Sequence, residues 1–229
     1  MTTSGTYVYN PSLGEITLYA YNLIGIRNTS LVQEHMEAAR MAANMMLGRW
    51  SSEGVNLWAV DLQTVTLVQG TSTYSVPDNT VAMLDAYVTT GTGTDAINRL
   101  ILPISRTEYA SYPNKKQQGF PTTYWFDRLL SPTVTLWPVP DGNEVSFSYY
   151  RVRQVQDSNL TSAQTVEIPY YFLEAFAYGL AQRLAMVWAP DKVPLLKPLA
   201  DEAYDLAARQ NIETAQQYIS PMISSYFRA

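Results

Sequence analysis

FPTTYWFDRLLSPTVTLWPVPDGNEVSFSYYRVR, residues 120–153, decides much of the fold, together with the nearly all-apolar segment PYYFLEAFAYGLAQRLAMVWAP at 169–190. In the first stretch, apolar or alternating runs at 122–128, 133–137 and 145–152 predict a β-meander, with a turn at Pro140-Asp141-Gly142-Asn143. Such a meander holds a shape and contains no reaction chemistry. The second stretch predicts a helix that is apolar nearly all round, which is typical of a central helix or of one covered by a neighbouring subunit.

Further helices are expected on both sides of this β-rich stretch. Ser12-x-x-Glu15 is a capping box that predicts a first helix ending at Gly25. A second helix should start near residue 29 or 30 and run toward Gly54, because its apolar residues recur at helical spacing. We also expect a short helix at 106–112 and a last helix from 194 to about 218. Alternating apolar residues between turn signals predict strands at 57–68, 74–76, 81–88 and 97–102.

This order of elements predicts an α+β fold in which a helical bundle from both chain ends carries an inserted β-rich domain. The expected divisions are N-terminal bundle helices at 1–56, the β-rich domain at 57–168, C-terminal bundle helices at 169–218 and an extended tail at 219–229. No internal repeat recurs at a fixed period, so a repeat architecture is not expected.

Composition restricts the class of protein. The chain has 229 residues, 47% of them hydrophobic, which is enough to bury a sizeable core. It has no Cys, so disulfides and thiolate metal sites are excluded. No apolar run reaches bilayer-spanning length and no secretory signal pattern opens the sequence, so we expect a soluble protein made in the cytoplasm, without membrane contact.

Charge is sparse and unevenly distributed. The formal net charge is −5 for residues 1–96, +3 for 97–155 and −3 for 156–229. A protein that grips duplex DNA through phosphates normally clusters Lys and Arg, because binding depends on counterion release. This chain lacks that pattern, and if it lines a path for DNA, its net negative wall suits a conduit better than a clamp. Its 17 Tyr and 5 Trp favour large protein–protein contacts, although many of these rings can equally fill the core.

Several segments together resemble a known family. They are YNLIG at 21–25, EHMEAARMAANMMLGRWSSEGVNLW at 34–58, YWFDR at 124–128, LWPVPDG at 136–142 and IPYYFLEAFAYGLAQRLA at 168–185. Spread over essentially the whole chain, they resemble the podovirus head-to-tail adaptors, the packaged-DNA stabilisation or tail accessory factor family. The resemblance implies a virion protein at the head–tail junction. It implies a ring of twelve copies that closes the portal exit after packaging and supplies a platform for the tail nozzle. The implied partners are the portal protein, the nozzle protein, further copies of this chain, and double-stranded DNA passing through without sequence-specific binding.

A few residues have the chemical character of a catalytic or metal site. His35 is the only histidine, and Ala38 and Ala39 occupy the i+3 and i+4 positions where a second metal ligand would be expected. The sequence has no G-x-S-x-G elbow for a Ser-His-Asp hydrolase, and TTGTGTD at 89–95 lacks the Lys of a P-loop. We therefore expect no catalytic, cofactor-binding or metal site and no enzymatic activity.

Two further groups have a structural and a functional interpretation. Asp201 and Asp205 could form a glycosidase pair, but like charges at i,i+4 favour a solvated helix face or channel wall. The methionines at 36, 41, 45 and 46 could form an adaptable docking face, but their helical spacing among alanines favours core packing.

Two segments are expected to bind partners. The polar loop at 113–119 contains Lys115 and Lys116, which we predict to contact the nozzle or a neighbouring subunit. We predict the same kind of contact for the Gly-rich tip at 89–95. The tail at 219–229 follows a Ser220-Pro221 break and is predicted to dock on the portal. Its apolar anchors are Met222, Ile223, Tyr226 and Phe227.

The sequence leaves two alternatives to the adaptor role. One is a tail-associated cell-wall hydrolase, and the other is a tail-tube or head-completion protein of different ring symmetry.

Overall fold

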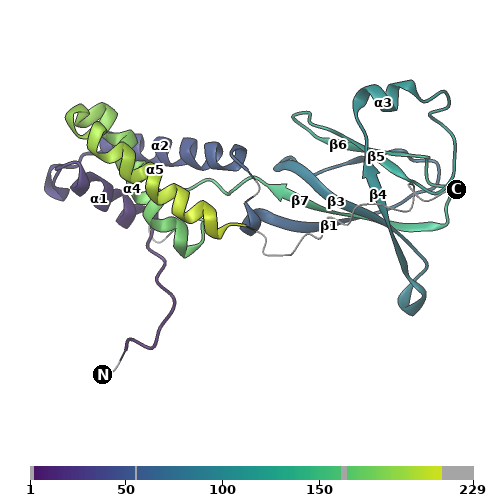
Figure 1. Ribbon diagram of the computed structural model, residues 1–229, viewed down its shortest axis with the longest axis horizontal. Helices are drawn as coiled ribbons and strands as arrows, with labels where there is room; N and C mark the ends of the chain where they lie inside the picture. Colours follow the sequence, from purple (N-terminus) through teal and green to yellow (C-terminus); the bar gives the residue numbers. More distant parts are fainter. Residues whose placement is uncertain (1–2, 55, 161–163, 213–229) are drawn as a thin grey trace, which may run out of the picture.

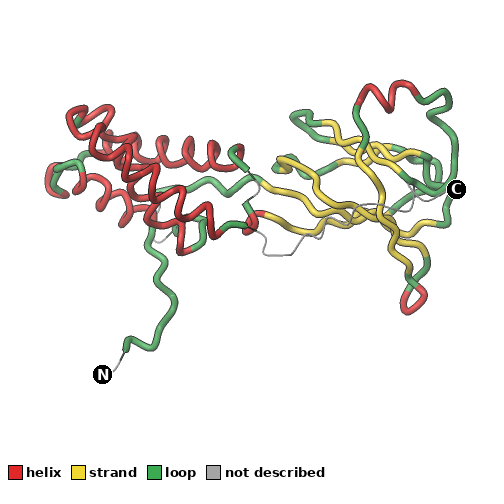
Figure 2. Tube along the Cα trace, viewed as in Figure 1, coloured by secondary structure: helices red, strands yellow, loops and turns green. Residues whose placement is uncertain are grey.

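The computed structural model describes residues 3–54, 56–160 and 164–212 of the chain. The molecule is elongated, with most of its helices gathered at one end and its strands at the other (Figures 1 and 2). The α+β class is confirmed. In the described ranges the α-helices are α1 Leu13–Leu23, α2 Gln33–Ser52, α3 Arg106–Ser111, α4 Leu173–Trp188 and α5 Val193–Gln210.

The helical end has one hydrophobic core that α1, α2, α4 and α5 share. α4 packs against the other three, as its nearly all-apolar sequence predicts, and Phe176, Leu180 and Leu184 are buried within it. The approach of α2 to α4 is close at Gly179, where a Cβ would lie 2.7 Å from Sδ of Met46. A side chain at this position would therefore force the two helices or Met46 to shift.

α2 differs from the sequence expectation in two respects. It begins at Gln33, because residues 28–30 form a separate 3-10 turn and the ring of His35 accepts a hydrogen bond from the backbone N–H of Val32 (3.4 Å). Met46 is buried, but Met41 and Met45 are each 61% exposed, so the interpretation of these two methionines as core residues was wrong. They lie on the side of α2 that the other helices leave uncovered.

The strands form one curled, mixed sheet in the order β1-β7-β3-β4-β5-β6-β2. Neighbouring strands are antiparallel except β4 and β5, which are parallel where Leu102 faces Thr123. The bounds are β1 Val60–Thr66, β2 Thr73–Ser75, β3 Thr80–Thr90, β4 Ile97–Pro103, β5 Thr123–Asp127, β6 Thr133–Trp137 and β7 Glu144–Arg153.

The predicted meander is wrong in its last step. β5 pairs with β6, but β7 lies between β1 and β3 instead of beside β6. Alternation along β7 identifies the face that will be buried, and Phe147 and Tyr149 are indeed fully buried, but it does not identify the neighbouring strands. The short strand β2 takes the position next to β6.

Polar contacts connect the sheet to the helical end. The backbone N–H of Leu57, just before β1, donates to Oδ1 of Asn211 at the end of α5 (3.0 Å). Arg153 at the end of β7 pairs with Glu167 in the segment that leads into α4. Polar contacts therefore join the helical end both to the segment just before the first strand, β1, and to the end of the last strand, β7.

Candidate interaction surfaces

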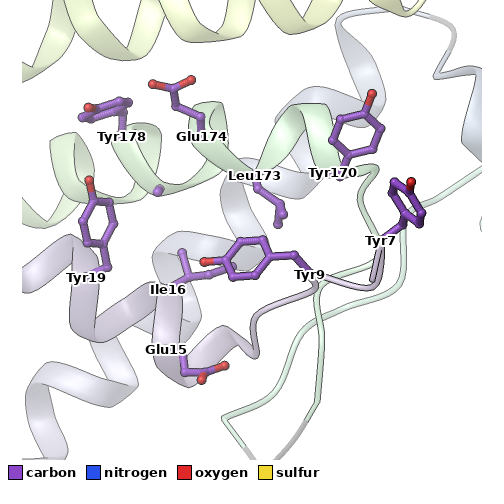
Figure 3. Close-up of a pocket in the computed structure, with 10 residues that line it drawn as sticks. Tyr7, Tyr9, Glu15, Ile16, Tyr19, Tyr170, Leu173, Glu174 and Tyr178 are labelled. Atoms are coloured by element: carbon purple, nitrogen blue, oxygen red, sulfur yellow. The ribbon is translucent and has the colours of Figure 1, made fainter. Parts of the chain in front are cut away.

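An aromatic groove of about 820 Å³ lies beside the first turns of α1 and α4 (Figure 3). Its walls come from the N-terminal arm (residues 3–11), from α1, from the 3-10 turn at 170–172 and from α4. We call it the aromatic groove because five of its lining side chains are tyrosines. The lining residues are Tyr7, Tyr9, Glu15, Ile16, Tyr19, Tyr170, Leu173, Glu174, Ala177 and Tyr178.

Local sequence explains why these side chains meet. Glu174 and Tyr178, like Leu173 and Ala177, are four residues apart on α4 and therefore share one side of that helix. Phe172 is buried against Trp58 (ring centroids 4.7 Å apart), and this leaves Tyr170 facing outward on the same short turn. The groove is thus a consequence of helix periodicity and of one anchored aromatic ring.

The N-terminal arm is fixed only at its root. The backbone N–H of Leu13 donates to the carbonyl oxygen of Gln164 (3.0 Å), and Ser12 and Glu15 form the predicted capping box. Beyond this root the arm has no helix or strand, and its backbone extends away from the helical end (Figure 1), while the side chains of Tyr7 and Tyr9 line the groove (Figure 3). Tyr7, Val8 and Tyr9 are 100%, 83% and 80% exposed.

The electrostatics of the groove suit binding of an uncharged or cationic apolar segment. The nearby hydroxyl of Tyr19 is the main cause of a raised pKa at Tyr178, with partial burial and Glu174 adding to it. Hydrogen bonds from Ser12 hold the pKa of the Glu15 carboxyl below its usual value. The lining thus offers hydroxyl groups, aromatic rings and two carboxylates, and within the described ranges it contains no cationic side chain.

Two more surfaces expose apolar side chains. On α5, Leu195, Leu199 and Leu206 are exposed at a spacing that places them along one stripe of the helix. On the outer face of the sheet, β1, β4 and β7 expose Leu62, Leu100, Leu102 and Tyr150. Exposed apolar side chains that gather on one face are typical of proteins that assemble with partners.

Lys115 and Lys116 lie in an exposed loop after α3, as the sequence predicts, but they differ in what they contact. The ammonium group of Lys115 donates to the carbonyl oxygens of Ala110 and Tyr112 (3.1 and 3.2 Å) at the end of α3. Lys116 makes only a backbone hydrogen bond, to the side chain of Asn114 (3.1 Å), among the contacts of the described residues. Lys116 is therefore the lysine whose side chain stays available to a partner, while Lys115 stabilises a helix end.

The loop that carries these lysines is held by aromatic stacking. Tyr112 stacks on Trp137 (centroids 4.0 Å apart) and Tyr109 on Trp125 (5.4 Å), which fixes α3 against β5 and β6. The indole N–H of Trp137 donates to the carbonyl oxygen of Asn114 (3.0 Å). The loop is therefore presented on a rigid support.

The other two predicted contact segments have different outcomes. The Gly-rich tip at 89–95 closes the β3–β4 hairpin and is exposed at its centre, where Gly91 has φ +76° and a Cβ would lie 2.6 Å from the carbonyl oxygen of Asp95. The predicted portal-binding anchors Met222, Ile223, Tyr226 and Phe227 lie outside the described residues.

The residues considered for chemistry have ordinary structural surroundings. The ring of His35 stacks on Trp188 (centroids 4.2 Å apart). In the described ranges no group of three or more His, Asp or Glu side chains is placed to hold a metal ion. Asp201 and Asp205 are exposed on α5, at the edge of a polar cleft of about 540 Å³ among α2, α4 and α5. This is the solvated helix face that their spacing favours.

Sequence reasoning missed the aromatic groove. Its residues come from three separate parts of the chain, and nothing in the sequence of α1 or of α4 indicates that the two helices are neighbours. The one available signal is the triplet Tyr7-Val8-Tyr9, three large side chains in a row in a segment too short to bury them by itself.

Several exposed apolar and aromatic surfaces on an α+β fold are typical of a protein that assembles with partners. The comparison with family models identifies the kind of assembly. The chain belongs to the SU10 adaptor protein family, a family of phage head–tail adaptors, whose model matches residues 27–224. This confirms the resemblance found in the sequence. The search of curated proteins finds no match. No described helix is long and apolar enough to cross a membrane.

Proposed function

We propose that this phage adaptor protein forms a ring between the portal and the tail nozzle, and that the ring helps to retain packaged DNA. The match to the SU10 adaptor protein family over residues 27–224 carries the proposal. In this role the protein is structural and non-enzymatic, and twelve copies surround the DNA channel at the head–tail junction of the virion.

The elongated shape supports this arrangement. We propose that the helices from residues 1–56 and 169–218 form one bundle, that residues 57–168 form an inserted β-rich domain, and that residues 219–229 form an extended tail. Two such parts at opposite ends of a subunit (Figure 1) can contact two different partners. The polar links between them, such as Leu57 with Asn211, would transmit the position of one partner to the other.

The exposed surfaces support contacts between copies. Interface cores lose charge and gain aromatic and aliphatic side chains. The leucine stripe on α5 and the outer face of the sheet have this character. The net charge of −5 supports passage of DNA through the ring without tight phosphate binding.

Two sites carry the proposed partner contacts. The tail anchors Met222, Ile223, Tyr226 and Phe227 bind the portal. The loop at 113–119 binds the nozzle or an adjacent subunit. In this contact the ammonium group of Lys116 meets the partner, while Lys115 holds the loop through its hydrogen bonds to the end of α3.

Phage particles made without this chain test the function. We expect heads that package DNA, then lose it, and carry no nozzle. Particles that keep both their DNA and their nozzle would contradict the proposal.

Peptidoglycan zymography of the full chain separates this role from a cell-wall hydrolase, for which a cleared band is the signature. The mass of the assembled ring, expected to be twelve times 25.7 kDa, separates it from a tail-tube or head-completion protein of different symmetry.

A further inference from the structure

On the basis of the proposed ring, we propose that the sheets of neighbouring copies join edge to edge, with strand β1 of one copy pairing with strand β4 of the next. Two open strand edges would make this contact. We call them the β1 edge (residues 63–66) and the β4 edge (residues 98–101). The ring requires some contact between copies, and these edges are the surfaces whose backbone geometry fits one another.

Strand β4 is paired along one side and largely open along the other. It pairs with β3 over residues 97–101, but with β5 only at residues 102 and 103. The backbone N–H of Leu102 donates to the carbonyl oxygen of Thr122 (3.1 Å), on the β5 side. Because backbone groups alternate in direction along a strand, those of Asn98 and Leu100 also point away from β3. Neither residue has a backbone hydrogen bond on that side to any described residue.

Strand β1 is open along its outer side, because it is the first strand in the spatial order of the sheet and pairs with β7 alone in the described ranges. The backbone N–H of Leu67, just after β1, donates to the carbonyl oxygen of Val145 (3.1 Å), on the β7 side. By the same alternation, the backbone groups of Thr64 and Thr66 point outward. They have no backbone partner on that side among the residues that the structure describes.

The two edges are in phase with one another. Four rungs of residues run straight across β1, β7, β3 and β4, between the register shifts of the β3–β7 pair. The rungs are Gln63, Tyr149, Ala86 and Ile101; Thr64, Ser148, Tyr87 and Leu100; Val65, Phe147, Val88 and Arg99; and Thr66, Ser146, Thr89 and Asn98. The residues with outward backbone groups therefore end the same two rungs. When two copies meet along these rungs, Thr64 faces Leu100 and Thr66 faces Asn98, and each pair can exchange two backbone hydrogen bonds.

The directions of the strands also match. β1, β7, β3 and β4 are each antiparallel to the next, so β4 runs opposite to β1. A copy rotated about an axis along the strands brings its β1 beside β4 in antiparallel orientation, which is slightly more stable than parallel pairing. The rotation also keeps the same face of the sheet on the same side. Because the two edges are different surfaces, the contact is head-to-tail and can close into a ring.

Neither edge has the features with which natural proteins prevent strand pairing, such as proline, lysine or a bulge. Residues 63–66 and 98–101 contain no Pro or Lys. Their one charged side chain, Arg99, lies over the ring of Phe120, with the guanidinium carbon 5.1 Å from the ring centroid. Beside the β4 edge, Ile97 and Leu100 are instead 55% and 66% exposed. The β3–β4 hairpin extends clear of the rest of the sheet (Figure 1), so a strand from a neighbouring copy can reach it.

The size of the joined sheet fits the proposed ring. With strands about 4.8 Å apart, four strands from each of twelve copies would form a belt roughly 230 Å around and about 70 Å across if they ran along the ring axis. Tilted strands would widen the belt. It would leave room for a DNA duplex at its centre. Four residues per edge bury much less than the roughly 800 Å² per partner of a stable interface, so the pairing adds to other contacts between copies.

Disulfide formation between Thr64→Cys and Leu100→Cys in assembled particles tests the pairing. Across a joined edge the two Cα atoms would lie about 5.5 Å apart, within the range of a disulfide. Within one copy these residues lie on opposite sides of two intervening strands, about 14 Å apart, so a disulfide within one chain is excluded. The chain has no native cysteine. We expect oxidised particles of the double variant to give a ladder of linked multimers on a non-reducing gel.

A matched control replaces Leu100→Cys by Leu130→Cys. Leu130 is 99% exposed and lies between β5 and β6, so the chain with Thr64→Cys and Leu130→Cys should stay monomeric on the same gel. Particles that contain the Thr64→Cys, Leu100→Cys chain without a ladder would overturn edge pairing and leave the proposed ring standing. Absence of the native chain from purified particles would instead contradict the proposed function, and the pairing with it.

Leu100→Pro tests the same contact without cysteine. Proline removes the outward N–H of residue 100, which no described strand of the same copy uses, and an edge strand tolerates proline at such a position. We expect the isolated variant to melt at the same temperature as Leu100→Ala, but to enter particles in severalfold fewer copies. Equal incorporation of the two variants would overturn the proposal.

Cross-linking also identifies other occupants of the two edges. A thiol-to-amine link from Leu100→Cys to a different virion protein, without the multimer ladder, would overturn the proposal in favour of that protein. A bis-maleimide link from Thr64→Cys to Ile223→Cys of the same chain, again without the ladder, would overturn it in favour of the C-terminal tail.

Discussion

Glu167 and Arg153 form a two-bond ion pair between the end of β7 and the segment that enters α4. The guanidinium of Arg153 donates to both carboxylate oxygens, and the backbone N–H of Gln156 donates to one of them (2.9 Å). These bonds to the charged form hold the pKa of Glu167 below its ordinary value of 4.5. The pair therefore ties the end of β7 to the segment that enters α4, and it is complete only while the carboxyl is ionised.

Glu167→Gln tests this pair. We expect a loss of about 1 kcal/mol in the free energy of unfolding at neutral pH, since the pair is bidentate but partly exposed. A lowered carboxylate pKa contributes stability above 4.5 that disappears as the pH falls through the folded value. The melting temperature of the native protein should therefore fall more than that of the variant between about pH 6 and about pH 3. Glu202→Gln, an exposed glutamate with no ion pair among the described contacts, is the control. Parallel pH curves for the native protein and Glu167→Gln would show that the pair is not coupled to folding.

Gly179→Ala tests the close approach of α2 to α4. Alanine favours a helix by about 1 kcal/mol over glycine, but overpacking costs about 1–3 kcal/mol, and Sδ of Met46 lies 2.7 Å from the new Cβ. We expect a lower melting temperature. Gly48→Ala is the matched control, because a Cβ there meets no atom within 4 Å and should raise the melting temperature. Thermal unfolding of the two variants should shift in opposite directions, and a rise for both would disprove the tight crossing.

Lys116→Glu tests the loop at 113–119. We expect weaker attachment of the nozzle with portal binding unchanged, measured by co-purification of each partner with particles. Lys197→Glu on α5 reverses the same charge at an exposed position at the helical end and should leave nozzle attachment intact. Lys115→Glu should also destabilise the end of α3, because it removes the ammonium group that donates to the carbonyl oxygens of Ala110 and Tyr112. Normal nozzle content in Lys116→Glu particles would mean that the loop is only a solvent-facing turn.

Truncation after Tyr218 tests the tail. Burying Met222, Ile223, Tyr226 and Phe227 on the portal would contribute on the order of 6–12 kcal/mol before the cost of ordering, from roughly 1.5–3 kcal/mol each. We expect loss of portal binding with an unchanged melting temperature. A lower melting temperature with portal binding intact would show that the tail belongs to the subunit's own core.

The isolated protein is expected to be mainly monomeric and to assemble on the portal. The exposed leucines of α5 form a short stripe and not a sustained heptad seam, so we expect contacts between copies to be of mixed character and to need the portal as a template. Analytical ultracentrifugation measures this directly. A stable ring at micromolar concentration without portal would contradict the expectation.

Local signals in the sequence predicted most elements and failed on their partners. The structure confirms helix α1, which the capping box of Ser12 and Glu15 predicts. It also confirms strands β3 and β4, which the alternation at 81–88 and 97–102 predicts. The position of β7 between β1 and β3 was not predictable, because alternation defines a face and not a neighbour. Met41 and Met45 show the same limit on a helix, since their spacing cannot say how many helices will cover α2.

The candidate sites likewise have features that the sequence predicts and features that only the three-dimensional arrangement reveals. The exposed loop of Lys115 and Lys116 followed from its polar composition, while the contact of Lys115 with the end of α3 required the three-dimensional arrangement. The aromatic groove depends on α1 and α4, which are separated by about 150 residues, and no local pattern joins them.

Cryo-electron microscopy of the intact phage particle tests the central claim most directly. We expect a ring of this chain between portal and nozzle, with twelve copies around the DNA channel and with the helical and β-rich ends contacting different partners. Density for the chain elsewhere in the particle, or a head–tail junction that does not contain it, would contradict the claim.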